Sequence, residues 1–224
     1  MLNNKNLQKN LGKTGVQPTR NLGPLFKISS WNMTSDDFRG ISISPVLSKI
    51  FEHYVLRRFE SYFVTSDNQF GFKKCLSCSH AIFTVRSAIN HYMSHGSTVN
   101  LCAVNISKAF DRINHNGLFL KLMDQFLPLN VLLTLENWFG KCYTCVKLGS
   151  IISCMFQLTR GIRQGGVLSP YLFAVYVDDL IATIEYTRCG CFYKSICVSI
   201  VMYADDILLL SPSVTALQDL LLFA

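Results

Sequence analysis

Long uninterrupted apolar stretches are missing from this chain of 224 residues. Half of the residues are hydrophobic, yet no apolar run reaches the ~18–20 residues that a helix needs to cross a bilayer. The longest run, residues 167–177, contains Pro170 and ends at Asp178 and Asp179. The sequence therefore disfavours a membrane-spanning protein, no membrane partner is expected, and the apolar excess is expected to form a buried core.

Charged residues are also scarce, and acidic residues are the scarcer kind. Charged residues make up 16% of the chain, with 14 Asp and Glu against 21 Lys and Arg. So little charge in a chain that is half hydrophobic excludes an intrinsically disordered protein. The net charge of +7 is compatible with a polyanionic partner such as nucleic acid, and ordinary solubility charge is the alternative.

The N-terminus lacks the apolar segment of a secretory signal, because residues 1–20 are polar and basic. The nine cysteines are therefore expected to be free thiols in a reducing, intracellular compartment. Two Cys-x-x-Cys pairs, Cys75/Cys78 and Cys142/Cys145, leave a zinc module as an alternative. Against that alternative, the second pair lies in a strand-like segment, where residues three apart point to opposite faces.

Internal repeats, low-complexity linkers and a regular β-α-β alternation are absent too. Residues 1–24, rich in glycine and proline, are expected to be a flexible, unstructured leader. Helices are expected at about 45–59, 79–95, 117–126, 130–139, after Pro170 and from about 213, with Ser44 and Ser169 as caps. Strands are expected at 98–106, 143–148, 151–158 and on both sides of residues 205–206. This order predicts an α+β fold in which helices cover one face of an antiparallel sheet.

Two adjacent carboxylates, Asp205 and Asp206, lie at a tight turn between apolar β-type segments. Because like charges repel at short range, such a pair is usually found where divalent cations neutralise it. Nucleotidyl transfer uses two Mg²⁺ ions ~4 Å apart, held by carboxylates on adjacent strands. A third carboxylate is expected on the strand that ends near residue 105, but the sequence has Asn105 there.

A glycine-containing segment, residues 160–170, precedes the turn by about 40 residues. It combines Arg160 and Arg163 with Gln164 and the glycines 165 and 166, just before a predicted helix start. The glycines would allow a ligand to approach the backbone closely, and a plain helix-entry turn is the alternative. Together with the Asp pair, the segment favours a ligand-binding loop.

A second Tyr-x-Asp-Asp sequence, Tyr176 to Asp179, follows Pro170 by only a few residues. It is therefore expected late on a helix, where neighbouring side chains diverge by about 100°. That geometry predicts a structural helix face and not a metal site.

Five segments, taken in order, resemble the motifs of the reverse transcriptase domain of non-LTR (LINE-like, jockey/CR1-type) retrotransposons. They are residues 38–52 and 67–74 for the fingers, then 107–115, 163–170 and 203–206 for the palm. The resemblance covers roughly residue 23 to the end, and the order and spacing of the motifs make it specific.

The resemblance implies an RNA-directed DNA polymerase with a right-hand fold. Residues 25–97 would be partial fingers and residues 98–224 the palm, with the thumb missing because it would lie beyond the last residue. The partners would be an RNA template with a DNA primer and deoxynucleoside triphosphates. The cofactor would be Mg²⁺ or Mn²⁺, and the compartment would be the nucleus. The implied metal ligands are Asp205 and Asp206, and the implied nucleotide contacts are Phe110 as sugar gate, Gln164, Gly165, Arg39, Lys73 and Lys74.

The chain departs from the family pattern at the catalytic aspartate that lies five residues before the gate aromatic. That position is Asn105, which keeps the shape of aspartate but loses its charge. Two hypotheses follow: a reverse transcriptase impaired by Asn105 and by truncation, or a catalytically dead or domesticated remnant that binds RNA.

Overall fold

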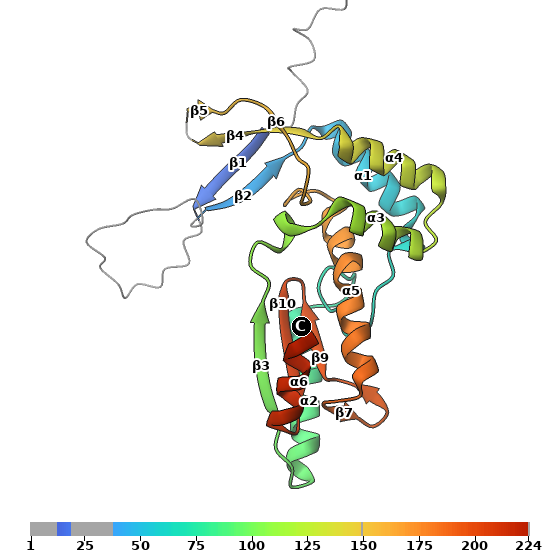
Figure 1. Cartoon of the computed structure of the whole chain (residues 1–224), viewed down its shortest axis with the longest axis vertical. Helices are drawn as coiled ribbons and strands as arrows, with labels where there is room; N and C mark the ends of the chain where they lie inside the picture. The colour runs from blue at the N-terminus through green and yellow to red at the C-terminus, as the bar shows by residue number, and fades with distance from the viewer. Residues whose placement is uncertain (1–12, 19–37, 149, 224) are drawn as a thin grey trace, which may run out of the picture.

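The computed structural model describes residues 13–18, 38–148 and 150–223, arranged as two larger sheets joined by a helical layer (Figure 1), with a separate two-stranded sheet at residues 192–197. The α-helices are α1 (Val46–Arg58), α2 (Cys78–Ser94), α3 (His115–Asp124), α4 (Leu129–Gly140), α5 (Ser169–Thr187) and α6 (Val214–Phe223). Two 3₁₀ turns are η3 (Glu60–Tyr62) and η4 (Ala109–Arg112). The strands are β1 (Lys13–Pro18), β2 (Phe38–Ile43), β3 (Asn100–Asn105), β4 (Tyr143–Leu148), β5 (Ile151–Ile152), β6 (Phe156–Gln157), β7 (Phe192–Tyr193), β8 (Ile196–Cys197), β9 (Ile200–Tyr203) and β10 (Asp206–Ser211).

The sheet that carries the Asp pair, called the palm sheet below, has the strand order β3-β10-β9 and is antiparallel throughout. Side chains alternate along β9 and β10, so Met202 and Leu209 face α5 and α6. Val201 and Leu210 face the other way and pack against α2. The predicted α+β architecture is confirmed, and α2 adds partial cover on the second face of the sheet.

The other sheet has the order β2-β1-β4-β5, with β6 paired to β4. β1 lies inside the segment expected to be an unstructured leader, so that expectation is wrong for residues 13–18. The reason is non-local: β1 pairs antiparallel with β2 and parallel with β4, which satisfies its backbone groups on both sides. The remaining leader residues lie outside the described part of the chain.

The helical layer packs α1, α3 and α4 around the first half of α5 (Figure 1). Its core is continuous and includes Leu118, Leu135, Leu172 and Phe173, none more than 1% exposed. α5 leaves this layer and continues to the palm sheet, where Ile181 and Ile184 are fully buried. One long helix therefore fixes the position of the sheet relative to the helical layer.

Two predicted serine caps are not formed. Pro45 is the N-cap of α1, and the buried Ser44 hydroxyl has no hydrogen-bond partner among the described residues. Ser169 lies inside the first turn of α5. The start of α5 is instead satisfied by Glu52 of α1, which is 2% exposed and accepts bonds from Val167 N (2.5 Å) and Leu168 N (3.0 Å). A buried carboxylate at a helix N-terminus also complements the helix dipole.

Among the described helices, none combines the length and the apolar character required to span a bilayer.

Candidate active site at the β9–β10 turn

Two antiparallel strands and the turn between them carry the adjacent carboxylates. β9 ends at Tyr203, β10 begins at Asp206, and Ala204 and Asp205 form the turn. β3 runs antiparallel to β10 in a register that places Asn105 opposite Asp206. The predicted pairing of the strand ending at residue 105 with the carboxylate hairpin is therefore confirmed.

Asn105 contacts the Asp pair directly. Its Nδ2 donates a hydrogen bond to Asp206 Oδ1 at 2.7 Å, and the backbone of Ile106 donates to Asp205 O at 3.1 Å. Asn105 and Asp206 are exposed and Asp205 is half-buried. An aspartate at position 105 would put like charges directly across the strands, whereas the amide forms a charge-assisted bond there.

The site opens onto the face of the sheet that α2 only partly covers. Asn105, Tyr203 and Asp206 share this face by strand alternation. A hollow of about 350 Å³ lies between them and α2, with Arg86 of α2 on its wall. The Asp206 carboxylate is therefore accessible to a ligand larger than a bare ion.

Phe110, the predicted sugar gate, follows β3 and lies in η4. Its ring stacks on Phe173 of α5, with 4.8 Å between centroids and 15° between planes. Phe72 contacts the same ring edge-on at 6.1 Å. Two aromatic rings from separate segments thus hold the half-buried gate ring in one orientation.

The glycine-containing loop packs against both the gate segment and the outer sheet. Ile162 N donates to Phe110 O at 2.8 Å, and a Cβ on Gly161 would lie 2.9 Å from the Asp111 backbone. Gly161 also has a φ of +76°, which favours glycine. At the other end of the loop, Ser42 N of β2 donates to Gln164 O at 2.8 Å.

Gly165 allows the loop backbone to lie close to Ser42 of β2. Its φ is +103°, and a Cβ there would lie 3.1 Å from Ser42 O. The loop therefore bridges the motif around residue 110 and the β2 motif. The roles of Gln164 and Gly165 in nucleotide contact stay predictions.

Comparison with known proteins gives the family. The family model described as reverse transcriptase (RNA-dependent DNA polymerase) matches residues 29–222. The chain belongs to this family. The probable RNA-directed DNA polymerase from transposon X-element of Drosophila melanogaster is 31% identical over 147 residues, which cover 64% of this chain and 16% of that protein. The RNA-directed DNA polymerase from mobile element jockey of Drosophila funebris is 26% identical over 206 residues, covering 88% and 22%.

These relatives confirm the resemblance to non-LTR retrotransposon reverse transcriptases, although the chain spans only about a fifth of their length. Among solved structures, telomerase from Candida albicans, in complex with a fragment of telomeric RNA, has a TM-score of 0.61 at 12% identity. The match covers 99% of this chain and 40% of the telomerase chain. At that identity the likeness concerns the fold alone, and it confirms the right-hand polymerase architecture.

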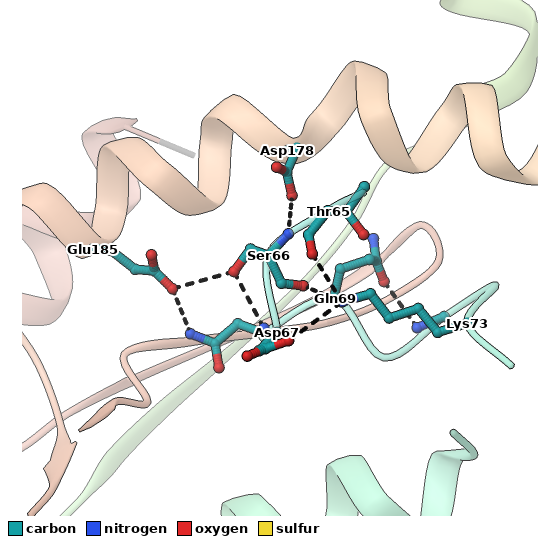
Figure 2. A network of polar contacts seen from close by, with 9 residues as sticks. Thr65, Ser66, Asp67, Gln69, Lys73, Asp178 and Glu185 are labelled. Atoms are coloured by element: carbon teal, nitrogen blue, oxygen red, sulfur yellow. Dashed lines mark hydrogen bonds and ion pairs between the residues drawn. The ribbon is translucent and has the colours of Figure 1, made fainter. Parts of the chain in front are cut away.

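Within this reverse transcriptase chain, the three predicted phosphate contacts lie on two elements. Lys73 Nζ donates to Thr65 O at 3.0 Å and to Ser66 O at 2.6 Å (Figure 2). Lys74 forms an exposed ion pair with Glu60 at 2.6 Å. Arg39 is in β2, and its side chain lies outside the described part of the structure. Both lysines therefore have protein partners that a phosphate would have to replace.

The second Tyr-x-Asp-Asp sequence lies on α5, as predicted, and its carboxylates have structural partners. Asp178 Oδ1 accepts a bond from Ser66 N at 2.8 Å (Figure 2), and Asp179 pairs with Lys121 of α3. Burial raises the pKa of the Asp178 carboxyl above its usual value, against the opposing effect of the Ser66 bond. Asp178 thus anchors the loop after η3 to α5.

The donor set for a metal at this turn consists of two carboxylates and one amide. Asp205 and Asp206 supply the carboxylates, and the third position is the Asn105 amide. Over residues 13–18, 38–148 and 150–223, no group of three or more His, Cys, Asp or Glu side chains is placed to hold a metal ion. All nine cysteines are free thiols.

Two residues with structural roles at the site were not assigned one from sequence, Glu52 and Gln69. Both are at most 2% exposed, and a buried polar side chain needs a partner. Their sequence neighbours include other polar residues, so the sequence carries no signal of this burial. The partner itself lies more than 100 residues away in each case.

Proposed function

We propose that the chain forms the fingers and palm of an RNA-directed DNA polymerase from a non-LTR retrotransposon. It would extend a DNA primer on an RNA template with deoxynucleoside triphosphates. The observation that carries this proposal is the strand register, because it gathers positions 105, 205 and 206 at one end of the palm sheet. The division into fingers at 25–97 and palm at 98–224 belongs to the same proposal.

Mg²⁺ or Mn²⁺ fits the donor set at the turn. Adjacent carboxylates on an accessible hairpin suit a hard cation that retains part of its water shell. Asp205 and Asp206 would hold the ions, and Asn105 would offer one amide oxygen. The bound metal would activate the attacking oxygen and offset the charge on the triphosphate.

The remaining residues would position the incoming nucleotide. The Phe110 ring, held by Phe72 and Phe173, would lie under the sugar and exclude a 2′-hydroxyl. The Gln164–Gly165 backbone, tied to β2, would contact the nucleotide, and Arg39 would face its phosphates with Lys73 and Lys74. Charge-assisted contacts of that kind suit a triphosphate.

Asn105 would weaken this site in two ways. A neutral amide is a poor Mg²⁺ ligand beside carboxylates. In addition, Nδ2 of Asn105 occupies Asp206 Oδ1, an oxygen that a metal would otherwise use. Loss of one well-placed electrostatic contact typically costs ~10²–10³ in rate.

The test is primer extension on an RNA template with Mg²⁺, comparing the chain as written with Asn105→Asp. Both versions would carry the thumb of a related element as a C-terminal fusion. We expect Asn105→Asp to raise the rate by about 10²-fold or more. Asn100→Asp is the matched control, since it makes the same change at the far end of β3, opposite Ser211. It should leave the rate unchanged.

Other outcomes separate the parts of the proposal. Equal activity of the chain as written and the Asn105→Asp variant would support the polymerase function and refute the proposal that Asn105 weakens the site. No activity in either well-folded fusion would refute the polymerase for this chain. The second candidate function, an RNA-binding remnant, is favoured by Asn105 itself and would then predict RNA binding without extension.

A further inference from the structure

The residues 68–70 extend the palm sheet beyond β9. Met202 N donates to Asn68 O at 2.8 Å, and Phe70 N donates to Met202 O at 2.8 Å. Gln69 and Met202 form a parallel bridge. A segment of the fingers motif therefore lies along the β9 edge of the palm sheet through a single parallel bridge and runs toward the β9–β10 turn.

Gln69 contacts the turn through its side chain. The residue is 0% exposed, and its Oε1 accepts bonds from Gly71 N (3.0 Å) and Ala204 N (3.3 Å). Its Nε2 is buried and has no partner among the described residues. Leaving this donor unpaired costs about 1–3 kcal/mol. The amide nevertheless keeps this orientation because two N–H groups converge on its oxygen.

Ala204 is the residue that needs such support. Its φ is +59°, a conformation that non-glycine residues seldom adopt and that costs on the order of 1–3 kcal/mol. The next residue is Asp205. Any relaxation of Ala204 would therefore move the Asp205 carboxylate relative to Asp206.

Gly71 makes the contact possible. A Cβ at this position would lie 2.3 Å from Ala204 N and 3.0 Å from Ala204 Cα. Only glycine lets the loop backbone lie directly against the turn.

The loop is itself fixed at several points. Glu185 Oε1 accepts from Asn68 Nδ2 at 2.7 Å, and Asp178 accepts from Ser66 N (Figure 2). Lys73 closes the loop by donating to two of its carbonyls. Gln69 thus reaches the turn from a frame anchored to α5.

We propose that Gln69 and Gly71 are positioning residues, which hold Ala204 in its positive-φ conformation and so set the placement of Asp205 beside Asp206. The importance of that placement for metal binding rests on the proposed function.

The deciding measurement is hydrogen exchange of the Ala204 amide by NMR, which requires neither metal nor activity. In Gln69→Met, which keeps the approximate volume but removes the acceptor, this amide should exchange at least ~10-fold faster. The amides of Ile207 and Leu209 should change little. Gln157→Met is the matched control. Gln157 lies in β6 of the other sheet and donates to Gly140 O of α4, so its replacement should leave the exchange of the Ala204, Ile207 and Leu209 amides unchanged.

A rescue variant separates positioning from packing. Glycine adopts positive φ without strain, so Ala204→Gly should restore most of the Mn²⁺ affinity that Gln69→Met removes. Affinity would be measured by calorimetry in the Asn105→Asp background, where we expect Gln69→Met to lower it by about 10-fold. Should Gln69→Met fail to fold, Gln69→Leu, which also removes the acceptor, with and without Ala204→Gly provides the same comparison.

The results that would overturn the inference differ from those that refute the proposed function. An unchanged Ala204 amide in Gln69→Met, or equal acceleration throughout the sheet, would reduce Gln69 to an ordinary core residue. The same conclusion would follow if Ala204→Gly restored none of the Mn²⁺ affinity that Gln69→Met removes. Absence of Mn²⁺ binding in every variant would refute the metal site, while the exchange data would still decide the role of Gln69.

Discussion

At the scale of single residues, chemistry depends on surroundings that the sequence does not display. Cys191 is fully buried, and burial raises the pKa of its thiol to about 11 despite a bond from Tyr92. Cys75, Cys78 and Cys154 are exposed. The positions of the cysteines in the sequence alone would not distinguish these thiols.

We predict that iodoacetamide at a pH of about 8 will modify Cys191 at least ~100-fold more slowly than Cys154, because only the thiolate reacts. Since the pKa is raised, reactivity should rise only as the pH approaches about 11. Peptide mass spectrometry over a time course measures the rates, with the urea-unfolded chain as control. Labelling of Cys191 alongside Cys154 in the folded chain would contradict the prediction.

At the scale of elements, the strands and helices around the Asp pair could be predicted because their signals are local. The apolar segments on both sides of the Asp pair predicted β9 and β10, and Pro170 predicted the start of α5. The prediction of a serine cap for α5 was wrong because the group that satisfies the start of this helix is Glu52, which lies 116 residues from Leu168. Local capping rules do not contain that partner.

Glu52→Leu should therefore destabilise the fold by about 2–4 kcal/mol, since it leaves two buried N–H groups unsatisfied. Glu52→Gln retains an acceptor oxygen and should cost about half as much. Urea unfolding measures both. Glu60→Gln is the control, because Glu60 forms an exposed pair with Lys74 and should cost under ~1 kcal/mol. Equal changes in the free energy of unfolding for Glu52→Leu and Glu60→Gln would contradict a capping role for Glu52.

At the scale of the whole molecule, the order of motifs predicted the right-hand architecture, and the long-range pairings other than that of β3 with β10 escaped prediction. β1 carries Gly15 and Pro18, which are poor strand formers, and it gains its structure from β2 and β4. Gln69 and Ala204 are 135 positions apart. Such contacts follow from the assembled fold and not from any local pattern.

The proposed function includes RNA binding, and the net charge of +7 predicts that this binding will depend on salt. With about three phosphate contacts, affinity for single-stranded RNA should fall ~10-fold or more between about 50 and 200 mM salt. Fluorescence anisotropy measures this. A peptide nucleic acid of the same sequence lacks phosphates and should bind weakly at every salt concentration. Salt-independent RNA binding would show that the positive charge serves solubility alone.

The pairing of Asn105 with Asp206 has a consequence for inheritance. Codons for asparagine and aspartate differ only in their first base, by one transition. Since the amide bonds Asp206, whereas a carboxylate at position 105 would put a like charge opposite it, the asparagine codon specifies the sheet at least as well as the aspartate codon. Selection for a folded product alone would therefore not restore the aspartate codon, although a single base change is enough to return the carboxylate.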